Sequence, residues 1–292
     1  MKWTPGGMSE DVEDRRDDDS GGGSSFGGFG GMHFGIGGTL LLLLLSFVFK
    51  TNLFSLFSSD GSATAPSSYE PRTSTRPREV NPNEQRSAQL VSFVLDDAQK
   101  TWEKILPEDG ASYRHAKLVL FRNVTQSSCG TAETATGPFY CPGDEKVYID
   151  LAFYDELARR FGAPGEFAQA YVIAHELGHH VQKILGIEGK VRQAQRRNPA
   201  AVNALSVRME LQADCFAGIW AHSTEQRNII DTSDVDAGLK AAAAVGDDHL
   251  QKMSTGHVSP ESFTHGTSAQ RMQWFKAGLD GGKVTGCNTF AE

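Results

Sequence analysis

Two histidines four residues apart are the residues of this chain best placed to do chemistry. His175 and His179 lie in residues 167–185, which contain no proline and one interior glycine, so the sequence predicts a helix there. Helical residues four apart share a face, and both imidazoles could therefore bind one metal ion. Glu176 follows about 100° further around the helix. From there its carboxylate could act on a water at the metal without displacing a ligand.

This H-E-x-x-H pattern is the signature of zinc proteases, in which the glutamate is the general base. The alternative is a chance match on a surface helix with two solvated histidines. A second pattern argues against chance, because Glu210 and Asp214 are also four apart in an apolar-periodic stretch. One of them could be the third zinc ligand, and the other could accept the second ring N–H of a ligand histidine. We therefore expect one Zn²⁺.

The E-x-x-A-D spacing after H-E-x-x-H resembles the gluzincin class of zinc peptidases. Several longer segments resemble one bacterial family, the predicted neutral zinc metallopeptidases of the YpfJ type. These segments are residues 12–16, 137–142, 174–182, 210–218 and 265–271. The resemblance covers nearly the whole chain. It implies a bacterial protein with a single-pass membrane anchor and a gluzincin-like zinc-peptidase domain.

The resulting hypothesis assigns a role to each residue. Zinc is held by His175, His179 and Glu210, and Asp214 orients a ligand histidine. Glu176 takes a proton from the metal-activated water, which attacks a peptide carbonyl, and returns the proton to the leaving amine. The predicted function is endopeptidase cleavage of peptide or protein substrates. The alternative is an envelope binding or scaffold protein that keeps the zinc without turnover, which would not need a base.

A third group of residues lies near the C-terminus. Thr267 and Gln270 have capping-box spacing, so a helix is expected to begin at Thr267. His265 then lies just before this helix, and Arg271 lies one to two turns into it. Their spacing resembles the His-Pro…Arg segment of the membrane-embedded CAAX-type zinc proteases, with Gly266 in place of proline. Either residue could donate to the oxyanion of a tetrahedral intermediate. Alternatively, His265 caps a turn and Arg271 pairs with a surface carboxylate.

Tyrosines are further candidates for the oxyanion donor, and the sequence does not choose among Tyr113, Tyr140, Tyr148 and Tyr171. Several other histidines have no partner at metal-ligand spacing. Structural or solvated roles are expected for His115, His180, His222, His249 and His257.

The N-terminal part of the chain differs from the rest in composition. Residues 1–33 carry seven acidic and three basic side chains and a Gly/Ser-rich stretch, which predicts a disordered tail. Residues 34–57 hold an uncharged run of sixteen residues and a second apolar patch beyond Lys50, and we expect a single-pass membrane anchor. A signal-peptide core and a buried helix are the alternatives. Residues 58–80, rich in Ser, Thr and Pro, predict a flexible linker.

The four cysteines all follow this predicted anchor. Cys129 and Cys141 close a small loop, and Cys287 could tether the C-terminus to Cys215. Two disulfides would place the domain outside the cytoplasm, on the outer side of the bacterial inner membrane. Four buried reduced thiols are the alternative. The net charge of −8 argues against nucleic-acid binding.

Residues 81–292 are expected to form the zinc metallopeptidase domain, an α+β fold that is mostly helical around a small sheet and is zincin-like. Asn81 and Pro82 have the pattern of a helix start. The clearest strands are residues 117–121 and 146–151. The second is expected to border the cleft as an exposed edge that pairs with extended substrate backbone.

Overall fold

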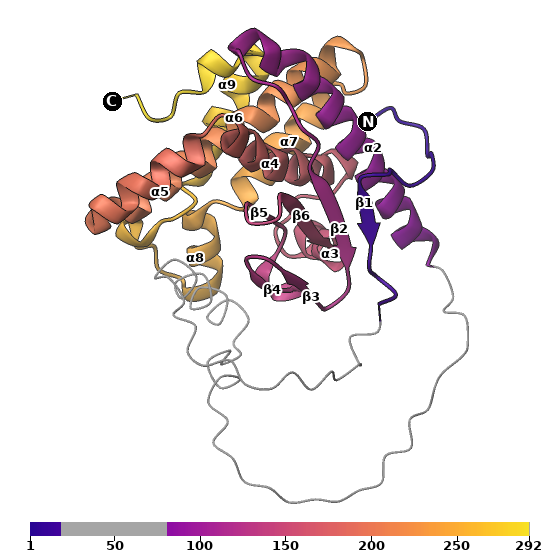
Figure 1. Ribbon diagram of the computed structural model, residues 1–292. Coiled ribbons are helices and arrows are strands. Elements are labelled where there is room, and N and C mark those ends of the chain that lie inside the picture. The colour runs from indigo at the N-terminus through magenta and orange to yellow at the C-terminus, as the bar shows by residue number, and fades with distance from the viewer. Residues whose placement is uncertain (19–80, 292) are drawn as a thin grey trace, which may run out of the picture.

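Helices make up most of the part of the chain that the computed structural model describes, residues 1–18 and 81–291 (Figure 1). The α-helices are α2 (Pro82–Ile105), α3 (Ala152–Arg159), α4 (Glu166–Ile184), α5 (Ile187–Arg197), α6 (Val202–Gln226), α7 (Thr232–Ala244), α8 (Asp247–Thr255) and α9 (Ser268–Gly281). The strands are β1 (Val12–Asp14), β2 (Lys117–Phe121), β3 (Val124–Ser127), β4 (Gly130–Glu133), β5 (Phe139–Cys141) and β6 (Lys146–Asp150). Short 3₁₀ helices occupy Leu106–Asp109, Thr134–Thr136, Pro199–Ala201, Pro260–Ser262 and Val284–Cys287. The predicted α+β class, mostly helical with small sheets, is confirmed.

Four strands form one mixed sheet in the order β1-β2-β6-β5, and β3 and β4 form a separate antiparallel pair. Strand β2 runs parallel to β1 and β6, whereas β5 runs antiparallel to β6. The expectation that residues 146–151 form an exposed edge is wrong, because β6 is paired on both sides. The apolar sequences of β2 and β6 fit central strands that are buried on both faces. The strands at the two ends of the sheet are β1 and β5.

Residues 1–18 are part of the folded domain, which contradicts the predicted disorder over this part of residues 1–33. Strand β1 pairs in parallel register with β2, and the backbone N–H of Arg15 donates to Leu120 O over 2.8 Å. The terminal amine bonds Asp234 over 2.7 Å. The acidic composition misled the prediction because these charges have partners, as in the 2.6 Å contact between Glu13 and Lys146.

This arrangement affects the predicted membrane topology. The expected anchor at residues 34–57 and linker at residues 58–80 lie outside the described residues. No helix within residues 1–18 and 81–291 is long and apolar enough to span a membrane. However, β1 precedes the expected anchor in sequence and β2 follows it, and the two strands are hydrogen-bonded neighbours (Figure 1). A single crossing between them would leave the two strands on opposite sides of the membrane. The single-pass expectation is therefore incompatible with this sheet.

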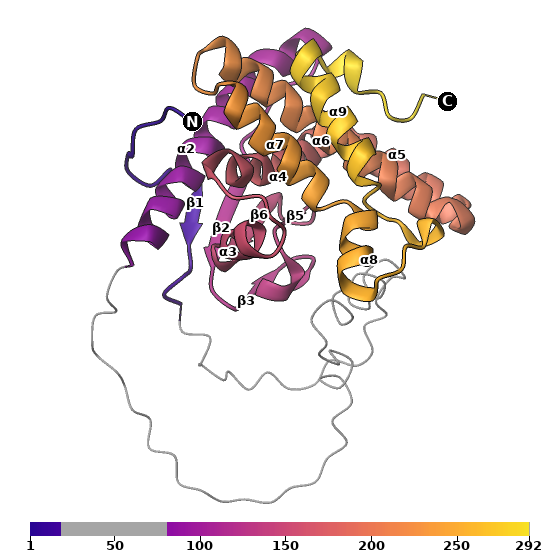
Figure 2. The ribbon, with the colours of Figure 1, turned by 180° about the vertical axis from the view of Figure 1, so that it is seen from behind.

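Small residues bring the central helices together. A Cβ at Gly178 of α4 would lie 2.9 Å from the backbone oxygen of Ala213 of α6, so the absence of a side chain allows this approach. Likewise, a Cβ at Gly278 of α9 would overlap the backbone oxygen of Cys215. Figure 2 shows α9 lying along α6, with α7 beside them. These contacts hold α4, α6 and α9 in one tight unit.

Local signals in the sequence agree with several helix ends. The Asn81 side chain caps α2 by accepting from Asn83 N. Thr267 and Gln270 form the predicted capping box at the start of α9, and Gly282 ends this helix in the left-handed region. The buried face of α2 includes Leu90, Val94, Ala98 and Trp102.

Both predicted disulfides are formed. Cys129–Cys141 joins the turn after β3 to β5, and Cys215–Cys287 ties the C-terminal segment to α6. No cysteine in the described residues is free. Disulfides persist in oxidising compartments, so these two bonds indicate an extracytoplasmic location.

Candidate metal centre

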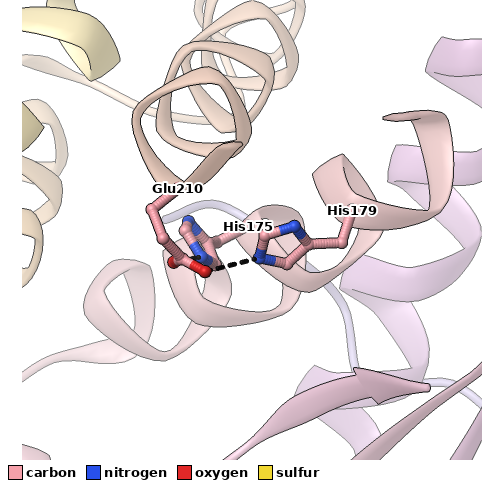
Figure 3. A group of neighbouring side chains, drawn as sticks. All are labelled: His175, His179 and Glu210. Carbon is pink, nitrogen blue, oxygen red and sulfur yellow. Dashed lines mark hydrogen bonds and ion pairs between the residues drawn. The ribbon is translucent and has the colours of Figure 1, made fainter. Parts of the chain in front are cut away.

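Three side chains from two helices converge on one point. His175 and His179 project from α4, and Glu210 reaches them from α6 (Figure 3). Glu210 Oε2 lies 3.1 Å from His175 Nε2, and Oε1 lies 3.5 Å from His179 Nε2. One ligand atom of each residue lies within 4.8 Å of the others. Among the described residues this group is the one that could hold a metal ion.

The helix contact described above explains this convergence. Gly178 lies between the two histidines in sequence, and Ala213 lies between Glu210 and Asp214. Because these two small residues meet, the side chains on either side of them face one another across the α4–α6 interface.

His175 is oriented by a buried carboxylate. Asp214 Oδ1 accepts from its Nδ1 over 2.9 Å, and the Asp214 side chain has no solvent exposure. Arg271 donates to both oxygens of Asp214, with Nε 2.8 Å from Oδ2 and Nη2 2.9 Å from Oδ1. The Tyr171 hydroxyl also donates to this carboxylate. The result is a buried network behind the histidine, in which every oxygen of Asp214 has a partner.

The charges around the ligands favour a cation. Burial alone would lower the pKa of His175, but Asp214 and Glu210 outweigh it and raise this pKa to about 10. Burial opposes ionisation of Glu210, yet the two ligand histidines bring its pKa well below the usual value. Burial likewise opposes ionisation of Asp214, and Arg271 and His175 bring its pKa below the usual value. The two carboxylates are therefore ionised beside the imidazoles.

His179 is oriented by a residue to which the sequence interpretation gave no role. Gln182, one turn further along α4, accepts from His179 Nδ1 through Oε1 over 2.8 Å. The signal that could have found it is its spacing, because a residue three positions after a ligand lies on the same helix face. Glutamine is common at such positions on helices, so the spacing alone does not identify Gln182 as a functional residue.

The arrangement suits zinc. Each histidine has its Nδ1 proton held by an acceptor, Asp214 or Gln182, so a metal that replaces the Nε2 proton would meet the lone pair of a neutral ring. Two imidazole nitrogens and one carboxylate form one of the standard catalytic zinc sets, with a fourth position left for water or substrate. Of the two acidic candidates, Glu210 joins the ligand cluster and Asp214 instead bonds a ligand histidine.

The ligands open onto a cleft of about 650 Å³. Glu176 lines it beside the ligands and is largely buried, with 7% of its surface exposed. Strand β5 contributes Phe139 and Tyr140, and α5 contributes Glu188 and Arg192. The base predicted from sequence therefore shares one cavity with the three candidate metal ligands.

His265 and Arg271 both lie at this cleft, but their environments differ. Arg271 has 3% of its surface exposed, and its guanidinium donates to Asp214, to Tyr171 and to Val245 O. The alternative that Arg271 pairs with a surface carboxylate is wrong, because its carboxylate partner, Asp214, is fully buried.

The His265 side chain is 30% exposed, and its Nδ1 lies 3.1 Å from Asp247 Oδ1. Asp247 also accepts from the His265 backbone N–H over 2.6 Å. Asp247 thus holds the turn before α9 and leaves His265 Nε2 for other partners.

The remaining candidate tyrosines and histidines differ in whether they line the cleft. Tyr140 and Tyr171 line the cleft, whereas Tyr113 and Tyr148 do not. The Tyr140 hydroxyl lies 2.9 Å from His180 Nδ1, and His180 Nε2 lies 2.7 Å from Arg114 O. Because a carbonyl can only accept, His180 donates to Arg114 and Tyr140 donates to His180. None of the histidines expected to have structural or solvated roles lines the cleft, namely His115, His180, His222, His249 and His257.

Known proteins related to this chain agree with the motifs. The family described as "Putative neutral zinc metallopeptidase" matches residues 1–290. The "Uncharacterized protein YpfJ" of Escherichia coli K12 is 48% identical over 295 residues, covering 100% of this chain and 99% of the relative. The "Uncharacterized protein Rv2575" of Mycobacterium tuberculosis H37Rv is 40% identical over 201 residues, covering 65% of this chain and 66% of the relative. No solved structure matches. The chain therefore belongs to the neutral zinc metallopeptidase family.

Proposed function

We propose that this protein is a zinc-dependent endopeptidase that cleaves peptide or protein substrates and has a zincin-like active site. The observation that carries the proposal is the convergence of His175, His179 and Glu210 with Glu176 in the same cleft. When bound to such a set, one zinc ion lowers the pKa of a water toward about 7 and polarises a carbonyl. A protein that only stored zinc would not need Glu176 beside the ligands.

Glu176 is the general base and then the general acid. Its carboxylate takes a proton from the attacking water, and the same proton passes to the amine nitrogen as the peptide C–N bond breaks. Asp214 keeps His175 in the tautomer whose Nε2 faces the metal position. Arg271 holds Asp214 in place and is therefore a positioning residue.

Strand β5 is the proposed docking edge for the substrate backbone. Within the described residues it pairs with β6 on one side only, and Phe139 and Tyr140 line the cleft. Unpaired N–H and C=O groups on such an edge can pair with an extended peptide, and this would present a peptide bond to Glu176. Strand β5 thus replaces residues 146–151 as the strand proposed to pair with the substrate backbone.

His265 is the proposed donor to the oxyanion. It lines the cleft, its Nδ1 is fixed by Asp247, and its Nε2 has no other protein partner among the described residues. Tyr140 is a weaker candidate because its proton is engaged by His180. Tyr171 is weaker still, because its proton goes to the buried Asp214.

Metal content together with proteolysis tests the proposed function. The full-length protein should bind one zinc per chain and cleave unfolded protein substrates, and a chelator should abolish both. Glu210→Gln should lose most of the zinc, because the third ligand becomes neutral. The rival function is a zinc-containing scaffold in the cell envelope. Stoichiometric zinc without cleavage of any substrate in a mixed proteome would support that rival.

The proposed location is the outer side of the bacterial inner membrane, with attachment through residues 34–57. The pairing of β1 with β2 requires residues 1–18 and residues 81–291 to share one compartment. An attachment between them would then cross the membrane an even number of times, or enter it without crossing.

Labelling with a membrane-impermeant thiol reagent tests this topology. Asp17, with 87% side-chain exposure, and Lys276, with 60%, are suitable positions for single cysteine substitutions. In intact spheroplasts both Asp17→Cys and Lys276→Cys should be labelled to the same extent as after lysis. Labelling of Lys276→Cys alone would restore the single-pass arrangement and show that β1 does not pair with β2 in the cell.

A further inference from the structure

The two ligand histidines are held in different ways. The Nδ1 of His175 faces a carboxylate that is itself paired with Arg271. The Nδ1 of His179 faces the neutral amide oxygen of Gln182 over 2.8 Å. A neutral amide can face a ring with either its oxygen or its nitrogen, so it fixes the tautomer only if its own orientation is fixed.

The surroundings of Gln182 fix that orientation. Its Nε2 lies 2.7 Å from the backbone oxygen of Met209 and 3.2 Å from Gln212 Oε1. A carbonyl oxygen can only accept, so the NH₂ group of Gln182 must face Met209. The Gln182 oxygen must then face His179, whose Nδ1 carries the proton and whose Nε2 is left free for the metal.

Gln212 is fixed in the same way. Its Nε2 donates to the backbone oxygen of Cys287 over 2.8 Å, which turns its Oε1 toward Gln182. Gln182 has no exposed surface and Gln212 has 5%. Water therefore cannot replace these bonds readily, and each amide has one low-energy orientation.

The far end of this chain of amides is the C-terminal segment. Cys287 is buried and bonded through its sulfur to Cys215, which lies on the same helix as Gln212 and Glu210. Two residues further on, the Thr289 hydroxyl donates to Arg208 O over 2.7 Å. The acceptor that orients Gln212 is thus held by a covalent bond and by a hydrogen bond to α6.

We propose that Gln182 and Gln212 are positioning residues that fix the tautomer of His179, with the disulfide-held Cys287 carbonyl as their anchor. Through them the C-terminal segment contributes to metal affinity, although it touches no ligand. This rests on the proposed function, because it requires His179 to bind zinc.

The test compares buried glutamines in the full-length protein. Gln182→Leu and Gln212→Leu each remove one member of the relay at nearly constant size. Gln99→Leu is the matched control, because Gln99 is also fully buried and bonded through both ends of its amide, to Asp11 and to Ala116 N, outside the cleft. Zinc affinity is measured by competition with a chromophoric chelator, the Co²⁺-substituted proteins are compared by their d–d spectra, and urea unfolding of the metal-free proteins reports stability.

We expect Gln182→Leu to bind zinc about 10- to 100-fold more weakly and to change the Co²⁺ spectrum. Gln212→Leu should change both in the same direction and by less. Gln99→Leu should lose stability with unchanged zinc affinity. If Gln182→Leu does not fold, the result for Gln212→Leu decides the test, because Gln212 contacts Gln182 and not the ligand histidine.

Two outcomes separate this proposal from the proposed function. If His179→Ala binds zinc as tightly as the parent, the assigned metal site itself is wrong. If His179→Ala loses zinc while both relay variants keep the parent affinity and spectrum, the metal site stands and the relay is overturned.

Discussion

The Glu176→Gln variant is expected to cleave peptides about 10²- to 10⁴-fold more slowly than the parent protein while its zinc content stays the same. Glutamine keeps the size and polarity of the side chain but cannot accept a proton from water. His175, His179 and Glu210 are untouched by this change, so zinc binding persists. Steady-state kinetics and metal analysis on one preparation measure both quantities.

Glu188→Gln provides the matched control for this experiment. Glu188 lies on α5, lines the same cleft and forms an ion pair with Arg192. Its neutralisation changes the charge of the cleft by the same amount without removing the proposed base, so kcat should be unchanged. Parent-like kcat in Glu176→Gln would show that another group takes the proton, and a zinc-free Glu176→Gln would show that this residue contributes to metal binding instead.

The second large effect concerns stability. Arg271→Met should lower the free energy of unfolding by about 3–5 kcal/mol, because it leaves the charge of Asp214 buried without its main partner. Urea unfolding measures this difference. Arg159→Met is the control. Arg159 pairs with Asp155, both side chains are exposed to solvent, and the pair should contribute less than about 1 kcal/mol. Similar losses in the two variants would mean that the Arg271–Asp214 pair is not needed to hold the site.

His265→Ala, measured in parallel, should show the opposite pattern. Loss of an oxyanion donor lowers kcat by about 10²–10³-fold without loss of zinc. If His265 instead only holds the turn through Asp247, the variant should lose stability and keep its kcat. In that case a cleft tyrosine becomes the favoured donor.

Residues on one helix were placed correctly by the sequence because helical spacing is local. The facing of His175 and His179 and the capping box at Thr267 both follow from positions three or four apart. Both disulfides were also predicted, because a short loop and a C-terminal tail each left one plausible partner.

Contacts between distant segments were harder to predict. The pairing of Arg271 with a buried carboxylate depends on how closely α9 approaches α6. The role of Gln182 depends on Met209 and Gln212, which belong to another helix. A signal for the helix contact was present in the sequence, since Gly178 and Ala213 each occupy the fourth position of a five-residue motif.

Strand pairing was the weakest part of the prediction. An apolar strand can be central or at an edge. Residues 146–151 were expected at an edge because they directly precede the helices with the zinc motif, and this position in the sequence does not determine strand order. The sequence of β1 is polar, and its order depends on the backbone groups of β2, more than a hundred residues later.

The separation of β1 from β2 along the chain affects the order in which this domain can fold. During synthesis, β1 emerges first, and its pairing is not complete until Leu120 has also emerged. Once the helical core and β2 have formed, the N-terminal segment behaves as a tethered ligand for the edge of β2. The fraction of molecules in which β1 is paired with β2 is then set by the effective concentration of the tethered segment. Long-range parallel pairing of this kind is slow to form. We therefore expect the closing of the sheet to be a late event in folding.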